Sequence, residues 1–200
     1  MEIYFPQKDV RYIAINDSID TIKDNNDIAP FMNLINDFYA KDISKKIRSA
    51  IKTKSSQGMF LGTYPPYGYM KDKSDSHKLL IDEESAAVVR RIFQMYLHGE
   101  GICAIAKVLN KDGVLSPMKH NQKQNPEMFK HPKWESKMEW THCTVRNALR
   151  NIVYLGHMVN GRQTTLSFKC KTPIYTDKSD WVIVEHTHEP IIDQESFEWN

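Results

Sequence analysis

A long helical repeat after Pro30 limits what this chain can fold into. Apolar residues recur there at spacings of three to five, which is the period of one helical stripe. A helix from Pro30 to about Lys54 would be roughly 37 Å long, which is longer than a small domain is wide. Asp27 is suited to cap this helix and Gly58 to stop it. The stripe consists of Phe31, Leu34, Phe38, Ile43, Ile47 and Ile51.

The second half of this helix is basic. Cationic side chains spread over several helical turns can neutralise phosphates along a duplex without reading its sequence. Lysines near a helix C-terminus can instead complement the helix dipole, which accounts for about two or three cations but not for a longer row. The row therefore indicates a polyanionic partner. Its members are Lys41, Lys45, Lys46, Arg48, Lys52 and Lys54.

Charge is distributed unevenly along the chain, although the formal net charge is only +2. Residues 41–54 carry +5 and residues 117–171 carry +7, whereas residues 1–40 carry −4 and residues 172–200 carry −6. Any single lysine-rich run could be a solvated face. Two such runs beside helical patterns favour a nucleic acid as the partner.

Composition excludes several other classes of protein. Apolar residues make up 40% of the chain, which is enough for a core and excludes a wholly disordered chain. No apolar run reaches the roughly 20 residues of a membrane helix, and the first residues do not begin a signal peptide. Cys103, Cys143 and Cys170 lie far apart without a CxxC pair, as expected of free thiols in a reducing compartment. We therefore expect a cytoplasmic protein.

The residue patterns do not indicate an active site, a metal centre or a cofactor. His186 and His188 would share one face of a strand, but no third ligand can be identified beside them. Serines lie among the lysines of the long helix without a His/Asp arrangement to activate them. The sequence contains neither a Walker loop nor a GxGxxG motif. We predict no catalytic residue, no metal ligand and no cofactor.

Three short helices are expected after a turn at residues 65–69. Each carries one apolar stripe, and helices this short must pack on one another to be stable. Asp82 and Thr141 are suited to cap the first and the third. Residues 119–137, between the second and the third, are rich in Lys, Gln, Asn and Pro and predict a long basic loop. The stripes are Val89, Ile92, Phe93 and Tyr96; Ile102, Ile105, Ala106 and Leu109; and Val145, Ala148, Leu149 and Ile152.

The extended segments are few. Residues 10–15 form a β-branched and apolar run that predicts a buried strand, and the polar residues 17–26 predict a loop. Residues 154–160 and 181–186 are typical of two strands, joined by a basic connection. A last helix is expected to begin near Asp193. The predicted fold class is α+β and mainly helical, with a small β element.

The third short helix has a face suited to DNA. If Val145 and Leu149 face the core, a polar set faces outward, and Arg and Asn are side chains that hydrogen-bond guanine and adenine edges in the major groove. The alternative is an ordinary solvated face. The helix from Ile102 to Leu109 would support this one, although the long loop between them departs from a compact helix-turn-helix. The outward set is Cys143, Arg146, Asn147 and Arg150.

Several blocks of the sequence resemble one known family. The recombinase domain of large serine recombinases is similar to residues 65–72 (PPYGYMKD), 79–117, 140–159 (WTHCTVRNALRNIVYLGHMV) and 181–199, in this order. Large resolvases carried by transposons of Gram-positive bacteria show this likeness in particular. Residues 10–17 (VRYIAIND) and 31–48 resemble the last strand and the dimerising helix of the family's resolvase-like catalytic domain.

The resemblance implies two domains and a reaction. Residues 1–57 would be the C-terminal remnant of the catalytic domain, and residues 58–200 a DNA-binding recombinase domain, truncated at its C-terminus. Family members cut both DNA strands with a nucleophilic serine, form phosphoserine links, exchange strands and religate without a high-energy cofactor. The segment with this serine would precede residue 10, and a zinc ribbon would follow residue 200. We therefore expect the catalytic serine to be missing from these residues.

The resemblance also implies roles for individual residues. Residues 31–38 would pack in a homodimer or against intact recombinase subunits. The basic part of the long helix would follow the backbone of double-stranded DNA, and the third short helix would read an attachment site or terminal repeat. The implied DNA-binding residues are Lys45, Lys46, Arg48, Lys52, Lys54, Arg146, Asn147 and Arg150.

Three hypotheses follow from the sequence. The first is a member of the site-specific serine recombinase family, which integrates or excises a mobile element, with an incomplete catalytic domain in this chain. The second is a non-catalytic protein that occupies recombination sites and competes with an intact recombinase. The third is an interaction module whose basic surface contacts RNA or acidic proteins.

Overall fold

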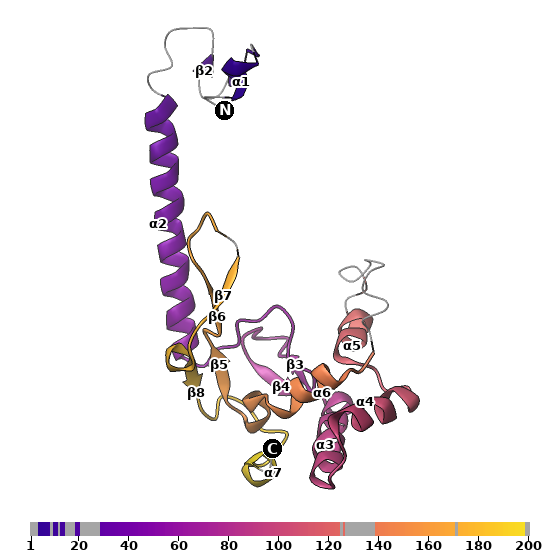
Figure 1. Cartoon of the computed structure of the whole chain (residues 1–200). Helices are drawn as coiled ribbons and strands as arrows, with labels where there is room; N and C mark the ends of the chain where they lie inside the picture. The colour runs from indigo at the N-terminus through magenta and orange to yellow at the C-terminus, as the bar shows by residue number, and fades with distance from the viewer. Residues whose placement is uncertain are drawn as a thin grey trace. The chain divides into compact units, whose positions relative to one another are not determined.

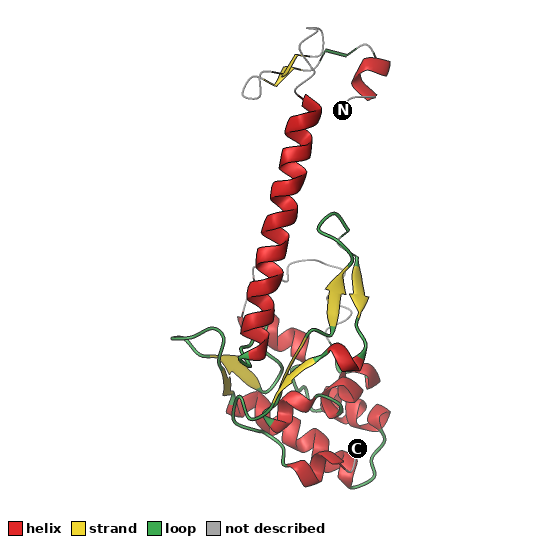
Figure 2. Ribbon diagram, turned by 90° about the vertical axis from the view of Figure 1, so that its left-hand side faces the viewer, coloured by secondary structure: helices red, strands yellow, loops and turns green. Residues whose placement is uncertain are grey.

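The computed structural model describes residues 4–8, 10–11, 13–14, 19–20, 29–124, 126, 139–170 and 172–198. The chain divides into two compact units, whose elements are labelled in Figure 1. Unit 1 comprises Met1–Ala50 and Thr165–Thr172, and unit 2 comprises Ile51–Thr164 and Pro173–Asn200. Helices occur together with small antiparallel strand pairs (Figure 2), which confirms the predicted α+β class.

The N-terminal strand of unit 1 is shorter than predicted and has a partner. After α1 (Tyr4–Gln7), β1 (Ile13–Ala14) pairs antiparallel with β2 (Ile19–Asp20). The prediction of an unbroken loop over residues 17–26 is therefore wrong at β2, where the β-branched Ile19 pairs with Ala14. The other residues of that loop, and Asp27, lie outside the described residues.

The long helix α2 (Ala29–Ser56) confirms the predicted repeat. It ends in a Schellman motif, in which Gly58 adopts a φ of 71° and donates its N–H to the Ser55 carbonyl at 3.0 Å, while Met59 donates to the Lys54 carbonyl at 3.1 Å. A Cβ atom at Gly58 would lie 2.4 Å from Thr187 Cγ2. Gly58 therefore stops the helix as predicted, both by its conformation and by its lack of a side chain.

The apolar residues of α2 lie on two sides of the helix. Successive residues turn by about 100°, so the step of five residues from Phe38 to Ile43 rotates the pattern by about 140°. The expectation of one continuous stripe is therefore wrong. All six side chains are exposed, by 40% to 67%. One side carries Phe31, Leu34 and Phe38, and the other carries Ile43, Ile47 and Ile51.

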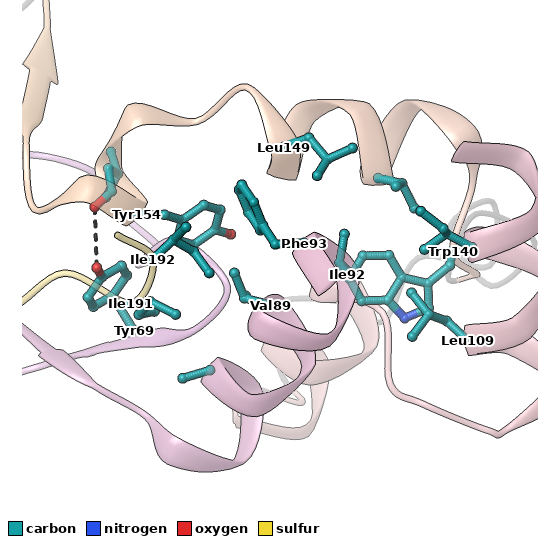
Figure 3. Packing of buried hydrophobic residues seen from close by; sticks show 14 of the residues in the cluster. Tyr69, Val89, Ile92, Phe93, Leu109, Trp140, Leu149, Tyr154, Ile191 and Ile192 are labelled. Atoms are coloured by element: carbon teal, nitrogen blue, oxygen red, sulfur yellow. Dashed lines mark hydrogen bonds between the residues drawn. The ribbon is translucent and has the colours of Figure 1, made fainter. Parts of the chain in front are cut away.

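Unit 2 has the predicted core of three short helices. α3 (Glu83–Leu97), α4 (Ile102–Lys111) and α6 (His142–Leu149) pack on one another. The hairpin of β3 (Tyr69–Lys71) and β4 (Leu79–Ile81) precedes them. Figure 3 shows how buried side chains from these elements meet. From the predicted stripes, the buried core contains Val89, Ile92, Phe93, Ile105, Ala106, Leu109, Val145 and Leu149.

Tyrosine hydroxyls fasten the hairpin to the chain that follows α6. The Tyr69 hydroxyl lies 3.2 Å from the Val153 carbonyl oxygen and 2.9 Å from that of Glu189, and Tyr154 donates to the Tyr67 carbonyl at 2.9 Å. Burial raises the pKa of Tyr69 and Tyr154 far above the ordinary value. Both hydroxyls therefore keep the proton that these hydrogen bonds need.

Part of the predicted basic loop is helical. α5 (Pro117–Gln124) begins with a proline, which favours the first helical position, and the Ser116 carbonyl accepts the His120 N–H at 2.8 Å. The His120 ring packs edge-on against Tyr67 at 5.4 Å between centroids, and its Nε2 lies 3.3 Å from Asp82 Oδ2. These contacts override the polar composition from which a loop was predicted. Residues 125 and 127–137 lie outside the described residues.

The two predicted C-terminal strands are present but short. β5 (Met158–Asn160) and β8 (Val182–Val184) pair antiparallel. The start of the first predicted strand instead belongs to the 3₁₀ helix η4 (Ile152–Leu155), so Ile152 does not continue the stripe of α6. A tight 3₁₀ turn here places both Val153 and Tyr154 in the core.

The connection between these strands is also structured. It contains the antiparallel pair of β6 (Gln163–Thr165) and β7 (Pro173–Tyr175), followed by the 3₁₀ helix η5 (Lys178–Asp180). The last helix, α7 (Gln194–Glu198), begins where it was predicted. The Asp193 carboxylate caps it by accepting the Ser196 N–H at 2.7 Å.

The histidine pair near the C-terminus is not on a strand face. β8 ends at Val184, and His186 adopts a positive φ of 53°. His188 Nε2 lies 2.8 Å from the Val153 carbonyl oxygen, and its Nδ1 lies 2.8 Å from Thr187 Oγ1. Both ring nitrogens of His188 are therefore engaged within the protein. The premise that His186 and His188 share one face of a strand is wrong.

Acidification is expected to destabilise unit 2 through His188. Burial lowers the pKa of His188, and nearby His157 lowers it further, whereas the bond to Val153 opposes the shift. The unfolded chain therefore takes up this proton at a higher pH than the folded chain, and stability falls as the pH drops through about 6.5. Thermal unfolding at about pH 7.5 and about pH 5.5 measures the effect. The fall in midpoint should be smaller in His188→Gln, and an equal fall in both proteins would refute this account.

Candidate nucleic-acid interface

The polar helix α6 starts at a well-formed cap. Thr141 accepts the Thr144 N–H through its hydroxyl at 3.2 Å, and the Thr144 hydroxyl accepts the Thr141 N–H at 2.7 Å. This reciprocal capping box satisfies two backbone donors that the helix itself cannot pair. It confirms the predicted N-cap and fixes where α6 begins. By contrast, the carboxylate of Asp82, the other predicted cap, makes no capping bond to α3 and accepts the Ser85 hydroxyl at 2.6 Å instead.

Helix α6 separates its apolar and polar residues as predicted. Val145 is 0% exposed and Leu149 is 3% exposed, because both face α3 and α4. Arg150 is the C-cap residue just beyond the helix, and its N–H donates to the Arg146 carbonyl at 3.2 Å. The side chains on the outer face are exposed; they belong to Cys143, Arg146, Asn147 and Arg150.

A side-chain clamp holds the start of α6 against α4. The Asn110 amide donates to the Trp140 carbonyl at 2.8 Å and accepts the Trp140 N–H at 2.9 Å. Trp140 is 3% exposed and packs edge-on against Tyr67 at 5.4 Å between ring centroids. No sequence pattern predicts this clamp, because Asn110 resembles an ordinary polar residue near a helix end. The two hydrogen bonds of Asn110 therefore fix the start of α6 against α4.

Three of the predicted backbone contacts share one side of α2. Lys45, Arg48 and Lys52 are spaced by three and four residues, so they lie within about 60° of one another around the helix. Their side chains are exposed, and Lys41 adds a fourth exposed cation on the same side. A row of this kind can contact successive phosphates along one stretch of a duplex.

Two of the predicted contacts already have partners. Lys46 forms an ion pair with Asp42 at 2.9 Å, one helical turn earlier, and its hydrogen bond and charge attraction to Asp42 raise the pKa of Lys46. Within unit 1, Arg48 Nη2 donates to the Thr165 carbonyl at 3.1 Å and to its hydroxyl at 3.3 Å. Both side chains are nevertheless exposed.

Lys54 lies apart from that row. It follows Lys45 by nine residues, which places it about 180° around the helix. Its Nζ lies 3.2 Å from Nε2 of His77, in the loop between β3 and β4. The structure therefore does not bring the five predicted residues of α2 onto one surface. Nothing in the sequence pattern of the hairpin indicates that His77 contacts the helix.

Two kinds of site were sought in the described residues, a cluster of metal-ligating side chains and a membrane-spanning helix. They contain no group of three or more histidine, cysteine or carboxylate side chains placed to hold a metal. Cys103, Cys143 and Cys170 are free thiols. None of the helices in the described segments combines the length and the apolar character needed to cross a bilayer.

Comparison with known proteins finds a matching family model and several similar solved structures, of which two are described here. A family model described as Recombinase matches residues 83–199, which is more than half of the chain. A structure described as "Sequence Requirements of the Listeria innocua prophage attP site" is 24% identical, with a TM-score of 0.46, over 78% of this chain and 48% of that chain. A "Crystal Structure of a LSR-DNA Complex" is 22% identical, with a TM-score of 0.47, over 77% of this chain and 36% of that chain. This chain thus spans about half and about a third of the two structures it matches.

Proposed function

This chain belongs to the Recombinase family, and from that premise we propose that it binds duplex DNA at the recombination site of a mobile element. The observation that carries the proposal is the outer face of α6. Arg146 and Asn147 project from a helix that is capped by Thr141 and clamped to α4 by Asn110. An Arg and an Asn on a rigid, exposed helix are suited to hydrogen-bond guanine and adenine in the major groove.

The second part of the proposal assigns the backbone contacts. Lys45, Arg48 and Lys52 form the row on α2 that would hold phosphates. Lys46 lies about 100° around the helix from Lys45 and would make a separate contact by leaving Asp42. These contacts supply affinity, whereas Arg146, Asn147 and Arg150 supply sequence preference. We keep the division into residues 1–57 and 58–200 as part of this proposal.

Dimerisation through α2 also belongs to the proposal. Phe31, Leu34 and Phe38 expose apolar surface on one side of the helix, by 54% to 67%. A second copy of the chain, or a subunit of an intact recombinase, would cover this surface. A duplex site with two halves would then be held by two copies of α6.

We further propose that these 200 residues bind DNA without cutting it and compete with an intact recombinase for the site. Two serines lie at the end of α2, among the basic residues that would contact DNA. Ser55 is 4% exposed, and the Ser56 hydroxyl donates to the Thr53 carbonyl at 2.8 Å. Burial withholds the Ser55 hydroxyl from a phosphodiester, and the Ser56 hydroxyl is bonded to the helix backbone.

One experiment tests both statements. The purified polypeptide is mixed with labelled duplex DNA that carries a nicked, strand-trapping site, and the mixture is run on native and denaturing gels. We expect a shifted band on the native gel and no labelled protein on the denaturing gel. A phosphoserine adduct would contradict the absence of cleavage. A complex displaced more readily by duplex RNA or polyglutamate than by duplex DNA would favour the interaction module instead.

A further inference from the structure

The end of α2 holds Lys54 in a fixed position within unit 2. Its carbonyl accepts the Met59 N–H at 3.1 Å in the Schellman motif, so the backbone turns sharply after Ser56. Gly58 packs against Thr187 and Val184, where a Cβ would lie 2.4 Å and 3.0 Å from their methyl carbons. The last turn of the helix is therefore anchored to the body of the unit rather than frayed.

His77 connects this helix end to the β3–β4 hairpin. The Phe60 N–H donates to the His77 carbonyl at 2.9 Å, and His77 Nδ1 lies 2.9 Å from the Phe60 carbonyl oxygen. Because a carbonyl only accepts, Nδ1 carries the proton, and Nε2 of the neutral ring accepts from the Lys54 ammonium at 3.2 Å. One imidazole thus orients a lysine that helical geometry alone would leave mobile.

A second lysine lies over the ring of Phe60, the residue whose backbone bonds to His77. The Lys71 ammonium lies 5.4 Å from the centroid of the Phe60 ring, which is within the range of a cation–π contact. Phe60 itself is 8% exposed, so its ring is a firm support. Lys54, Phe60, Lys71 and His77 together are called the hairpin cluster below.

The carboxylates beside the hairpin cluster are already engaged by the backbone. Asp72 accepts the Ser74 N–H and Asp75 accepts the His77 N–H, each at 2.9 Å. The bonds from Ser74, together with the charge of Lys78, lower the pKa of Asp72. These Asx turns shape the loop, and they direct both carboxylates at backbone N–H groups of the loop. Among the described residues, neither carboxylate forms an ion pair with Lys54 or Lys71.

We propose that the hairpin cluster is a phosphate-binding site for the DNA backbone, separate from the lysine row on α2. The inference rests on the proposed DNA binding and adds a contact surface to it. Lys54 and Lys71 would each contact a phosphate oxygen, and His77 is a positioning residue that acts through Lys54. Two ammonium groups held in place before binding lose less side-chain entropy than free lysines when they meet a phosphate. Because Lys54 lies about 180° around the helix from Lys45, its phosphate would differ from those that the lysine row contacts.

Single substitutions measured against salt test the site. Duplex affinity is determined at several salt concentrations for Lys54→Ala, Lys71→Ala and the matched control Lys73→Ala, which removes the same charge from the same hairpin. We expect the slope of log affinity against log salt to become shallower by about 0.9 for each lost contact, in Lys54→Ala and Lys71→Ala. The slope for Lys73→Ala should stay close to that of the unmodified chain.

A double-mutant cycle tests the role of His77. His77→Ala should weaken binding several-fold in the unmodified chain and have little further effect in Lys54→Ala. Thermal unfolding of each variant checks that its fold is intact. Additive effects of the two substitutions would overturn the positioning role. Equal slopes for Lys71→Ala and Lys73→Ala would overturn the phosphate site. If the unmodified chain does not bind duplex DNA at all, the proposed function fails and not only this site.

Discussion

Replacing Phe93 with alanine is expected to lower the free energy of unfolding of unit 2 by about 3–5 kcal/mol. Phe93 is 2% exposed and packs against residues of η4 and α7. Its ring packs edge-on against Tyr154 at 6.2 Å and stacks with Phe197 at 6.0 Å, measured between centroids. The substitution leaves a cavity that the neighbouring aromatic rings cannot fill without moving.

Denaturant titration of the two proteins measures this loss. Leu97→Ala is the matched control, because Leu97 lies on the same helix and is 42% exposed. We expect the control to change stability by less than about 1 kcal/mol. Equal effects of the two substitutions would show that the aromatic core around Phe93 does not hold unit 2 together.

Raising the salt concentration fourfold, from about 50 to about 200 mM, is expected to weaken duplex binding by about 40- to 500-fold. The range corresponds to three to five phosphate contacts, each with a slope of about −0.9 in log affinity against log salt. The lower limit counts the row of Lys45, Arg48 and Lys52 alone. The upper limit adds Lys54 and Lys71 of the hairpin cluster.

Fluorescence anisotropy of a labelled duplex measures this dependence directly. Lys46→Ala tests one further contact, because Lys46 must leave its ion pair with Asp42 to meet a phosphate. A slope unchanged by this variant would place Lys46 outside the interface. Binding that does not change with salt would show that the lysine row of α2 does not contact phosphates.

The short helices of unit 2 could be predicted because each repeats apolar residues at a helical period. The stripes of α3, α4 and α6 contain the residues that are now buried, and Thr141 caps α6 as its side chain predicts. Local sequence carries this information, since one helix turn brings residues three and four apart onto one face. The exposed Arg146 and Asn147 follow from the same geometry.

Features that depend on contacts between distant residues could not be predicted in this way. The polar composition of α5 predicts a loop, whereas its stabilising contacts come from Tyr67 and Asp82, which lie far away in the sequence. The clamp of Asn110 on Trp140 and the bond of His77 to Lys54 are of the same kind. The two-sided apolar pattern of α2 is different, because it follows from local sequence alone. A spacing of five residues does not continue a helical face, so one continuous stripe was the wrong expectation.

The measurement that tests the central claim most directly compares base reading with backbone binding. A duplex is selected from a random library by the unmodified chain, and its affinity is divided by that of a scrambled duplex. We expect Arg146→Ala and Arg150→Ala to lower this ratio by about 5- to 150-fold, equivalent to about 1–3 kcal/mol. Lys45→Ala should weaken binding to both duplexes alike and leave the ratio unchanged. The same ratio for all three variants would contradict the assignment of α6 as the helix that reads DNA.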